Sequence, residues 1–280
     1  MQYQWLKNCV RIVALGGLLG IAANAYADDQ ATASPEAAQE SPNKPATEKP
    51  GTDKPAAEKP LADPPGFKRL SKTHQVWISP ERRMLIVDGR ICLRQGQLEM
   101  LACPQKTKEH EAIVAVFSDA MTVHAGLLAI GAKSGSPVQF APEYKAATGS
   151  RIDVAVLWTD KEGKRQQMPA QKWVRHTQSK KELESSWVFA GSGFFVDEQT
   201  KEKFYQAETG DLICVSNFPT ATLDLPVESS QANSQLEFEA FTDRIPPVGT
   251  QVRLVLTFVP NAAPNAAPPG AAPKKVEAQP

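Results

Sequence analysis

The densest group of side chains that could do chemistry lies between residues 103 and 111. A thiol, an imidazole and two carboxylates occur there, and another histidine follows a short way along the chain. The set is Cys103, Glu109, His110, Glu111 and His124. Thiolate and neutral imidazole are ligands that zinc, iron and copper accept. The group therefore predicts a candidate transition-metal or redox site, although its spacing matches none of the common zinc or haem motifs.

The same segment has a simpler interpretation, which the sequence favours. Residues 105–111 are mostly polar or charged and separate two apolar stretches, so they are expected to form a loop. In that loop Glu109 and Glu111 would make ion pairs. His124 falls on the apolar side of a predicted helix, where a buried histidine is usually hydrogen-bonded to a backbone group.

Three cysteines follow residue 27, at positions 92, 103 and 214. An odd number in an exported protein implies at least one free thiol or an intermolecular bond. Cys103 could pair with Cys92 or with Cys214. An iron–sulfur cluster is disfavoured, because such clusters are generally held by four cysteines or by two cysteines and two histidines. A cysteine beside a histidine could also be the nucleophile of a hydrolase.

Three further polar residues are candidates for a binding or catalytic role. Ser192 stands between two glycines, but the serine-hydrolase pattern G-x-S-x-G is incomplete there, so a bulge or tight turn is expected. Asn217 and Asp224 follow a predicted strand, and binding groups often lie at such places. The alternative is that both side chains bond to nearby backbone amides.

Strands and one helix must position these residues. Alternating apolar residues predict strands over 152–158, 187–195, 212–216, 236–240 and 252–258. Residues 84–93 predict a β-hairpin, because Asp88-Gly89 suits a two-residue type I′ turn. The expected fold class is α+β, mainly antiparallel β with one or two short helices.

The clearer helix is predicted over residues 118–131, with Ser118 as N-cap and Gly131 at its end. A second short helix is predicted over 171–181. The first helix has an apolar face made of residues that recur at helical spacing. Those residues are Met121, His124, Ala125 and Leu128.

The two ends of the chain are predicted to lie outside the folded domain. Residues 1–27 have the basic start, apolar stretch and Ala-Tyr-Ala site of a signal peptide. Residues 28–66 are rich in Pro, Lys and Glu and predict an extended, disordered linker. A disordered Ala/Pro-rich tail is predicted over 260–280, which leaves 67–259 as the globular domain.

The charge balance narrows the choice of partners. Lys plus Arg and Asp plus Glu both number 31, so the formal net charge is zero. Nucleic acid is not an expected partner, because phosphate binding needs a surplus of basic residues. No transmembrane segment is expected after leader removal, and no Gly-rich phosphate loop is present in the sequence. We expect export to the periplasm or cell envelope, with a partner there.

Four segments together resemble a known family: 103–111, 124–131, 187–193 and 213–219. They are similar to the YdjY-domain proteins, which are exported proteins frequent in planctomycete bacteria. The likeness covers most of residues 76–258. It implies a globular domain of uncharacterised function, and some members carry a ferredoxin-like label. No catalytic residues are implied.

The sequence favours a non-enzymatic binding or structural module of unknown ligand, held out on a proline-rich tether. One alternative is a metal-binding or redox protein that uses Cys103 and His110. Another is a hydrolase that uses Cys103 or Ser192.

Overall fold

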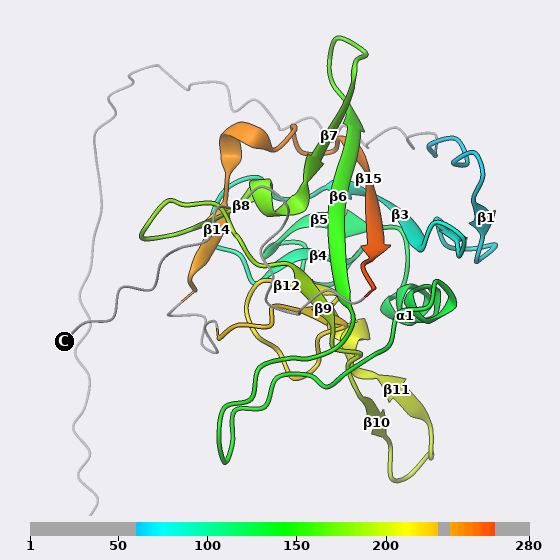
Figure 1. Ribbon diagram of the computed structural model, residues 1–280, viewed down its shortest axis with the longest axis vertical. Helices are drawn as coiled ribbons and strands as arrows, with labels where there is room; N and C mark the ends of the chain where they lie inside the picture. The colour runs from blue at the N-terminus through cyan, green and yellow to red at the C-terminus, as the bar shows by residue number, and fades with distance from the viewer. Residues whose placement is uncertain (1–59, 229–235, 261–280) are drawn as a thin grey trace, which may run out of the picture. The chain divides into compact units, whose positions relative to one another are not determined.

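The structure is a computed structural model that describes residues 60–228 and 236–260. The predicted signal peptide 1–27, residues 28–59 of the predicted linker and residues 261–280 of the predicted tail lie outside the described residues. Strands dominate what is described, and one α-helix lies beside them (Figure 1). No helix among the described residues has the length and apolar character needed to cross a bilayer.

The elements are short and follow one another closely. In chain order the strands and the α-helix are β1 (Lys68–Arg69), β2 (Val76–Ser79), β3 (Met84–Ile91), β4 (Met100–Pro104), β5 (Ala112–Val116), α1 (Ala120–Ala129), β6 (Arg151–Thr159), β7 (Arg165–Pro169), β8 (Val174–His176), β9 (Trp187–Phe189), β10 (Phe194–Val196), β11 (Lys203–Tyr205), β12 (Ile213–Cys214), β13 (Leu223–Asp224), β14 (Phe238–Ala240) and β15 (Gln251–Phe258). The 3₁₀ turns are η1 (Ala170–Trp173), η2 (Gln206–Thr209) and η4 (Thr242–Arg244).

Eight of these strands form a closed β-barrel. Their order is β3-β15-β6-β9-β13-β12-β4-β5, and β5 pairs back onto β3. The pairs β4–β5 and β12–β13 are parallel, and the other neighbours are antiparallel. The expected α+β class is therefore wrong: among the described residues strands account for 37% and helical residues of all kinds for 11%, with a single α-helix. The protein is a mainly β barrel.

The barrel closes where β3 changes its neighbour. The first half of β3 pairs with β2, and residues 89–91 pair with β5 on the same edge. The change occurs at Asp88, whose carbonyl accepts a hydrogen bond from Phe117 N (2.8 Å) while its own N–H donates to Gln75 O (3.1 Å). The predicted hairpin turn at Asp88-Gly89 is wrong, because β3 runs through both residues without reversing.

Tertiary contacts explain why a turn-like dipeptide stands inside a strand. A Cβ atom at Gly89 would lie 2.5 Å from the carbonyl oxygen of Ala115, so only glycine lets the two backbones approach this closely. The Asp88 carboxylate is 1% exposed and pairs with Arg253 of β15 through Nε (2.6 Å) and Nη2 (2.8 Å). A buried bidentate ion pair thus replaces the turn that the dipeptide would otherwise favour.

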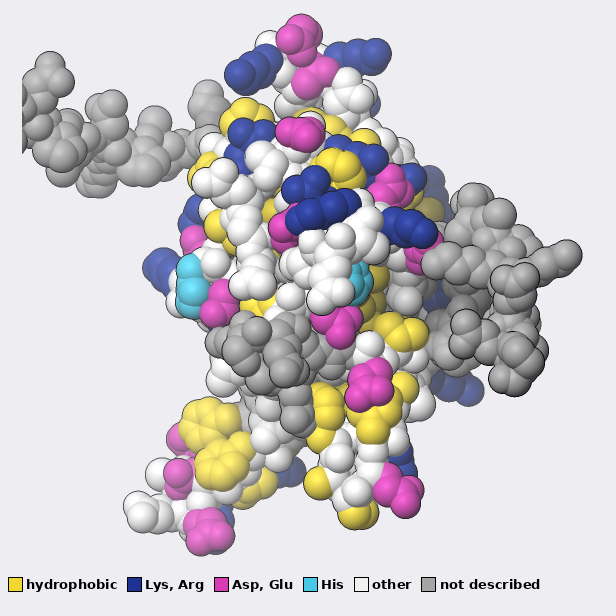
Figure 2. Space-filling model, turned by 90° about the vertical axis from the view of Figure 1, so that its left-hand side faces the viewer, with side chains coloured by type: hydrophobic (Ala, Val, Ile, Leu, Met, Phe, Trp, Pro, Cys, Tyr) yellow, Lys and Arg dark blue, Asp and Glu magenta, His cyan; other side chains and the backbone are white. Residues whose placement is uncertain are grey.

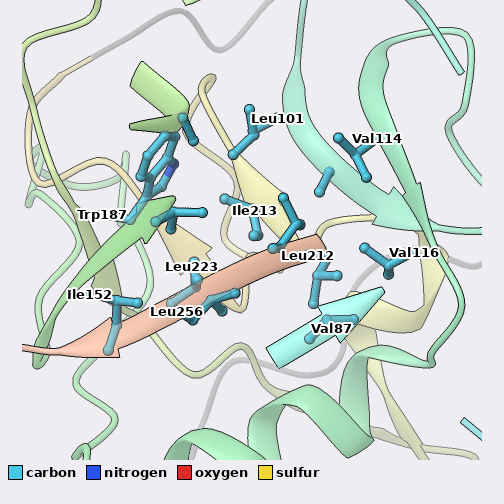
Figure 3. Packing of buried hydrophobic residues seen from close by; sticks show 14 of the residues in the cluster. Val87, Leu101, Val114, Val116, Ile152, Trp187, Leu212, Ile213, Leu223 and Leu256 are labelled. Carbon is cyan, nitrogen blue, oxygen red and sulfur yellow. The ribbon is translucent and has the colours of Figure 1, made fainter. Parts of the chain in front are cut away.

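Apolar side chains fill the inside of the barrel. Figure 3 shows them directed toward one another from β3, β4, β5, β6, β9, β12, β13 and β15. Trp187 is fully buried, and its indole Nε1 donates to the carbonyl oxygen of Cys214 (2.7 Å). Small barrels of this kind hold a packed core, not a pore.

Helix α1 packs through a different face from the predicted one. Its N-cap is Asp119, whose side chain accepts from Thr122 N, not Ser118. The buried residues are Ala120, Val123, Gly126 and Leu127, whereas Leu128 is 48% exposed. Gly126 decides the packing, since a Cβ there would lie 2.6 Å from Leu85 Cδ1.

The other local predictions have mixed outcomes. The second helix, 171–181, is wrong: a single 3₁₀ turn, η1, leads into β8, which pairs with β14. The predicted strands over 152–158, 236–240 and 252–258 correspond to β6, β14 and β15. Residues 187–195 form two strands, β9 and β10, separated by Gly191, which has a φ of +92°.

Replacement of Gly89 by alanine tests the closure of the barrel. The added methyl group meets backbone atoms of β5, so Gly89→Ala should lower the free energy of unfolding by about 1–3 kcal/mol in urea melts. Gly163→Asn is the control, because a Cβ at Gly163 meets nothing within 4 Å and Asn tolerates its φ of +78°. Equal stability of the two variants would contradict this closure.

Candidate functional site

The five predicted metal ligands lie in different surroundings. Cys103 is fully buried in β4. The side chain of His110 is 73% exposed, and its Nε2 lies 3.2 Å from the Glu111 carboxylate. His124 lies on α1 and contacts β11. In the described parts of the chain, no three or more His, Cys, Asp or Glu side chains form a group that could hold a metal ion.

Glu109 organises the loop between β4 and β5 in the way that the simpler interpretation expects. Its Oε2 lies 2.9 Å from Arg90 Nη2 on β3, and its Oε1 accepts from the backbone N–H of Lys106 (2.8 Å). Lys106 has a φ of +67°, so this hydrogen bond supports a turn that a lysine seldom adopts. The carboxylate thereby fixes the loop to the barrel wall.

All three described cysteines are free thiols. Burial raises the pKa of Cys92 to about 12 and that of Cys103 to about 11, and it also raises the pKa of Cys214, which is fully buried. Cys92 Sγ donates to the carbonyl oxygen of Ala112 (3.0 Å). A protonated thiol is neither a good nucleophile nor a metal ligand. These cysteines behave as small apolar side chains.

A buried ion-pair cluster, which the sequence did not predict, lies beside this loop. Lys108 Nζ lies 2.9 Å from Asp211 Oδ1 and 3.4 Å from Glu99 Oε2. The two carboxylate side chains are only 5% and 4% exposed, and that of Lys108 is 27% exposed. We call these three residues the acid–lysine cluster. Lys108 also lies over the ring of Phe218, with Nζ 4.6 Å from its centre.

The electrostatics of the cluster keep its lysine charged. Burial alone would lower the pKa of Lys108, but Asp211 and Glu99 outweigh it and the pKa is raised. Burial, together with a hydrogen bond to Glu111, raises the pKa of Glu99 to about 7, although Lys108 opposes the shift. A lysine held protonated cannot act as a nucleophile. Its role here is to neutralise two buried carboxylates and tie the loop to β4 and to the segment before β12.

The sequence does contain a sign that the two acids of this cluster are buried. Glu99 interrupts the apolar run 98–102, and Asp211 directly precedes the buried residues 212–215, which include β12. A lone acid inside an apolar run must be paired if it is buried. The loop between β4 and β5 supplies the lysine, but the partners are distant in sequence, so only the fold shows which lysine it is.

Asn217 and Asp224 do come together, inside the protein. Asn217 Nδ2 donates to Asp224 Oδ1 (3.1 Å) and to the carbonyl oxygen of Leu225 (3.2 Å), and Leu225 N donates to the same carboxylate (2.8 Å). Burial raises the pKa of Asp224 to about 7. The pair bonds local backbone, as the alternative to a binding role expects.

His124 and Ser192 both lie near Tyr205. His124 Nδ1 lies 2.8 Å from the Tyr205 hydroxyl, and burial lowers the pKa of the histidine. Ser192 has a φ of +53°, and its Oγ donates to the carbonyl oxygen of Thr220 (2.7 Å). Burial raises the pKa of Tyr205 to about 12, although hydrogen bonds from Thr222 and Ser192 lower it. The hydrogen bonds of Tyr205 thus anchor the base of the hairpin that β10 and β11 form.

The hairpin formed by β10 and β11 carries the most exposed aromatic side chains among the described residues. Phe194, Phe195 and Phe204 are 55%, 54% and 50% exposed, and Val196 is 43% exposed. Figure 1 shows the hairpin projecting beyond the barrel and α1, and Figure 2 shows hydrophobic side chains on the two projections at that end. We call this element the aromatic hairpin.

The base of the aromatic hairpin is held firmly. Tyr205 is 4% exposed, and its hydroxyl lies 3.0 Å from Thr222 Oγ1 and 3.2 Å from Gly191 O, in addition to His124. Just after β11, the Glu208 carboxylate accepts from the N–H groups of Ala120 (3.1 Å) and Met121 (2.8 Å) at the start of α1. The exposed rings therefore project from a fixed base.

These features define a β-barrel domain with a packed interior, a buried charge cluster at a loop and a projecting aromatic hairpin. Residues 76–257, which are more than half of the chain, match the family model of the YdjY domain. The chain therefore belongs to the YdjY domain family, as its resemblance implied. No curated protein and no solved structure gives a significant match to the chain.

Removal of the lysine tests the acid–lysine cluster. Lys108→Met should lower the free energy of unfolding by about 3–5 kcal/mol at pH 8, because it leaves two buried carboxylates without their cation. Lys164→Met, at an exposed turn, is the matched control and should change stability by less than about 0.5 kcal/mol. A loss no larger than that of the control would show that Lys108 does not neutralise the two acids.

Glu99 should make stability depend on pH. Its pKa is about 7 in the folded state and 4.5 ordinarily, so between these values the folded protein keeps a proton that the unfolded chain releases. Stability therefore falls as pH rises from about 4.5 to 7. Asp224 acts in the same direction, and His124, whose pKa is lowered, acts in the opposite one.

The variant Glu99→Gln isolates this contribution. Its stability relative to the unchanged protein should rise by about 2 kcal/mol between pH 5 and pH 8. Urea melts at several pH values measure the difference, with the exposed Glu162→Gln as control. Parallel curves for Glu99→Gln and the unchanged protein would contradict the raised pKa.

Proposed function

We propose that this chain is an exported, non-enzymatic binding module of the cell envelope that recognises its partner through the aromatic hairpin. The observation that carries the proposal is the contrast between the exposed rings of Phe194, Phe195 and Phe204 and their buried, hydrogen-bonded base. Large exposed apolar patches on soluble domains commonly mark interaction sites. Aromatic side chains are also enriched where binding energy is concentrated.

Preorganisation supports a binding role for this surface. A two-stranded hairpin alone is marginally stable in water. Here β10 and β11 are joined to the barrel by Tyr205 and to α1 by Glu208. A fixed base lowers the entropy that a partner's binding would otherwise cost.

The state of the reactive groups supports a non-enzymatic role. The three thiols have raised pKa values, and Lys108 is held protonated between carboxylates. Ser192 and His124 each bond to a structural partner, Thr220 and Tyr205. The metal-binding alternative with Cys103 and His110 and the hydrolase alternative gain no support from this geometry.

The sequence supports the proposed location. Residues 1–27 have the pattern of a cleavable leader, and residues 28–66 are rich in proline and charge. The resemblance to exported planctomycete-type proteins agrees with this. We propose that the linker holds the domain away from its point of attachment, so that the hairpin can reach a protein of the envelope.

Position-specific photo-cross-linking tests the proposal. A benzophenone amino acid replaces Phe195 in the hairpin or, as a control, the exposed Gln167 of β7, in chains exported by the organism that encodes them. Position 195 should give a discrete cross-linked protein in the envelope fraction that position 167 does not give. The double variant Phe194→Ser and Phe204→Ser should remove that product without changing the melting temperature.

Two results would contradict the proposed function. One is equal cross-linking at positions 195 and 167. The other is a specific turnover in a substrate panel that Cys103→Ala, His110→Ala or Ser192→Ala abolishes.

A further inference from the structure

The aromatic hairpin presents apolar side chains on both of its faces. Phe195 is opposite Phe204 and Phe194 is opposite Tyr205, so neighbouring pairs point to opposite sides of the ribbon. Among the described residues, β10 and β11 pair only with each other. Away from the buried Tyr205, each face of the hairpin therefore presents exposed apolar side chains to a further segment of chain.

The size of the exposed surface favours a short segment over a second folded copy. A fully exposed aromatic side chain offers roughly 200 Å², so the exposed parts of the four apolar side chains present on the order of 400 Å². A stable interface between folded proteins buries about 600–1,000 Å² on each side. The patch falls below that range but suits an extended peptide.

Along the hairpin, apolar side chains lie in the two strands and charged side chains lie at the tip. The apolar residues lie in β10 and β11, and the connecting tip 197–202 carries three acids and one lysine, with a second lysine at the start of β11. The acids Asp197 and Glu198 directly follow the apolar run of β10. A segment that is complementary to this surface would have an apolar part for the strands, followed by basic residues for the acids of the tip.

The C-terminal segment of this chain has that order. Residues 261–273 consist of Asn, Ala, Pro and Gly without a charge, and Lys274-Lys275 follow. Proline-rich segments favour the polyproline II conformation, which aromatic surfaces recognise because little conformational entropy remains to be lost.

The C-terminal segment starts close enough to the aromatic hairpin to reach it. The ring of Phe258 lies 3.8 Å from where a Cβ at Gly131 would be, so β15 ends near the C-terminal end of α1. Glu208, just after β11, caps the N-terminal end of α1. The helix has 10 residues and spans about 15 Å. Twenty further residues in polyproline II conformation reach about 60 Å.

We propose that residues 261–280 bind back onto the aromatic hairpin of the same molecule. The Ala/Pro-rich part covers Phe194, Phe195 and Phe204, and Lys274 and Lys275 lie beside Asp197 and Glu198. This inference rests on the proposed function, because it takes the hairpin as the docking surface and names the segment that covers it when no partner is bound.

Cross-linking in the purified full chain tests this inference in the absence of any partner. A benzophenone amino acid at position 195 should form cross-links to peptides from 261–280, identified by mass spectrometry. Their yield should not change with protein concentration, because the contact is intramolecular. The same group at position 167 should give none above background.

Matched variants test separately the charged part and the apolar part of the contact between the tail and the hairpin. Lys274→Glu with Lys275→Glu should lower the cross-linking yield about fivefold at low salt, and high salt should lower the yield of the unchanged chain. Phe204→Ser should lower it as well. Val248→Ser removes an apolar side chain, 58% exposed, that is not part of the hairpin, and should leave the yield unchanged.

Two outcomes would overturn the inference. One is the absence of tail cross-links from position 195. The other is a yield that rises with protein concentration and links two copies of the chain. Either result leaves the proposed function standing if the envelope experiment still gives a cross-linked partner at position 195. If the envelope experiment gives no partner but tail cross-links form in the purified chain, the proposed function is contradicted and the intramolecular contact stands.

Discussion

The close approach of β3 and β5 is the constraint on which the rest of the structure depends. Gly89 allows the carbonyl oxygen of Ala115 to lie where a side chain would otherwise be, and Asp88 beside it pairs with Arg253 of β15. This seam turns an open sheet into a closed barrel. It also fixes β5, and with β5 the loop that carries Lys108.

Closure determines where polar groups can be placed. Charged groups that are buried against apolar side chains must be paired, as Glu99 and Asp211 are with Lys108 beside the β4–β5 loop. Several of the candidate site residues make structural contacts. Glu109 supports a turn, Asp224 and Asn217 bond local backbone, and the thiols pack as apolar groups. The aromatic hairpin is the surface that we propose for interaction.

The sequence predicted what depends on local periodicity and missed what depends on distant partners. The long strands β6 and β15 alternate along their length, so they could be located directly. Asp88-Gly89 has the local preference of a turn, but Arg253 and Ala115, far along the chain, override it. On α1, a glycine against Leu85 selects the packing face, which periodicity placed on the other side. The acid–lysine cluster joins three separate segments, so no single stretch of sequence contains it.

Amide hydrogen exchange at the β3–β5 seam tests the central claim most directly. The N–H of Phe117 donates to Asp88 O and that of Cys92 donates to Ile113 O, both across this seam. If the barrel is closed, these two amides should exchange only through global unfolding, with the same protection as the central amides of β15. Exchange at the seam that is a hundredfold or more faster than in β15 would mean that β3 and β5 separate in the native protein, and it would contradict the account.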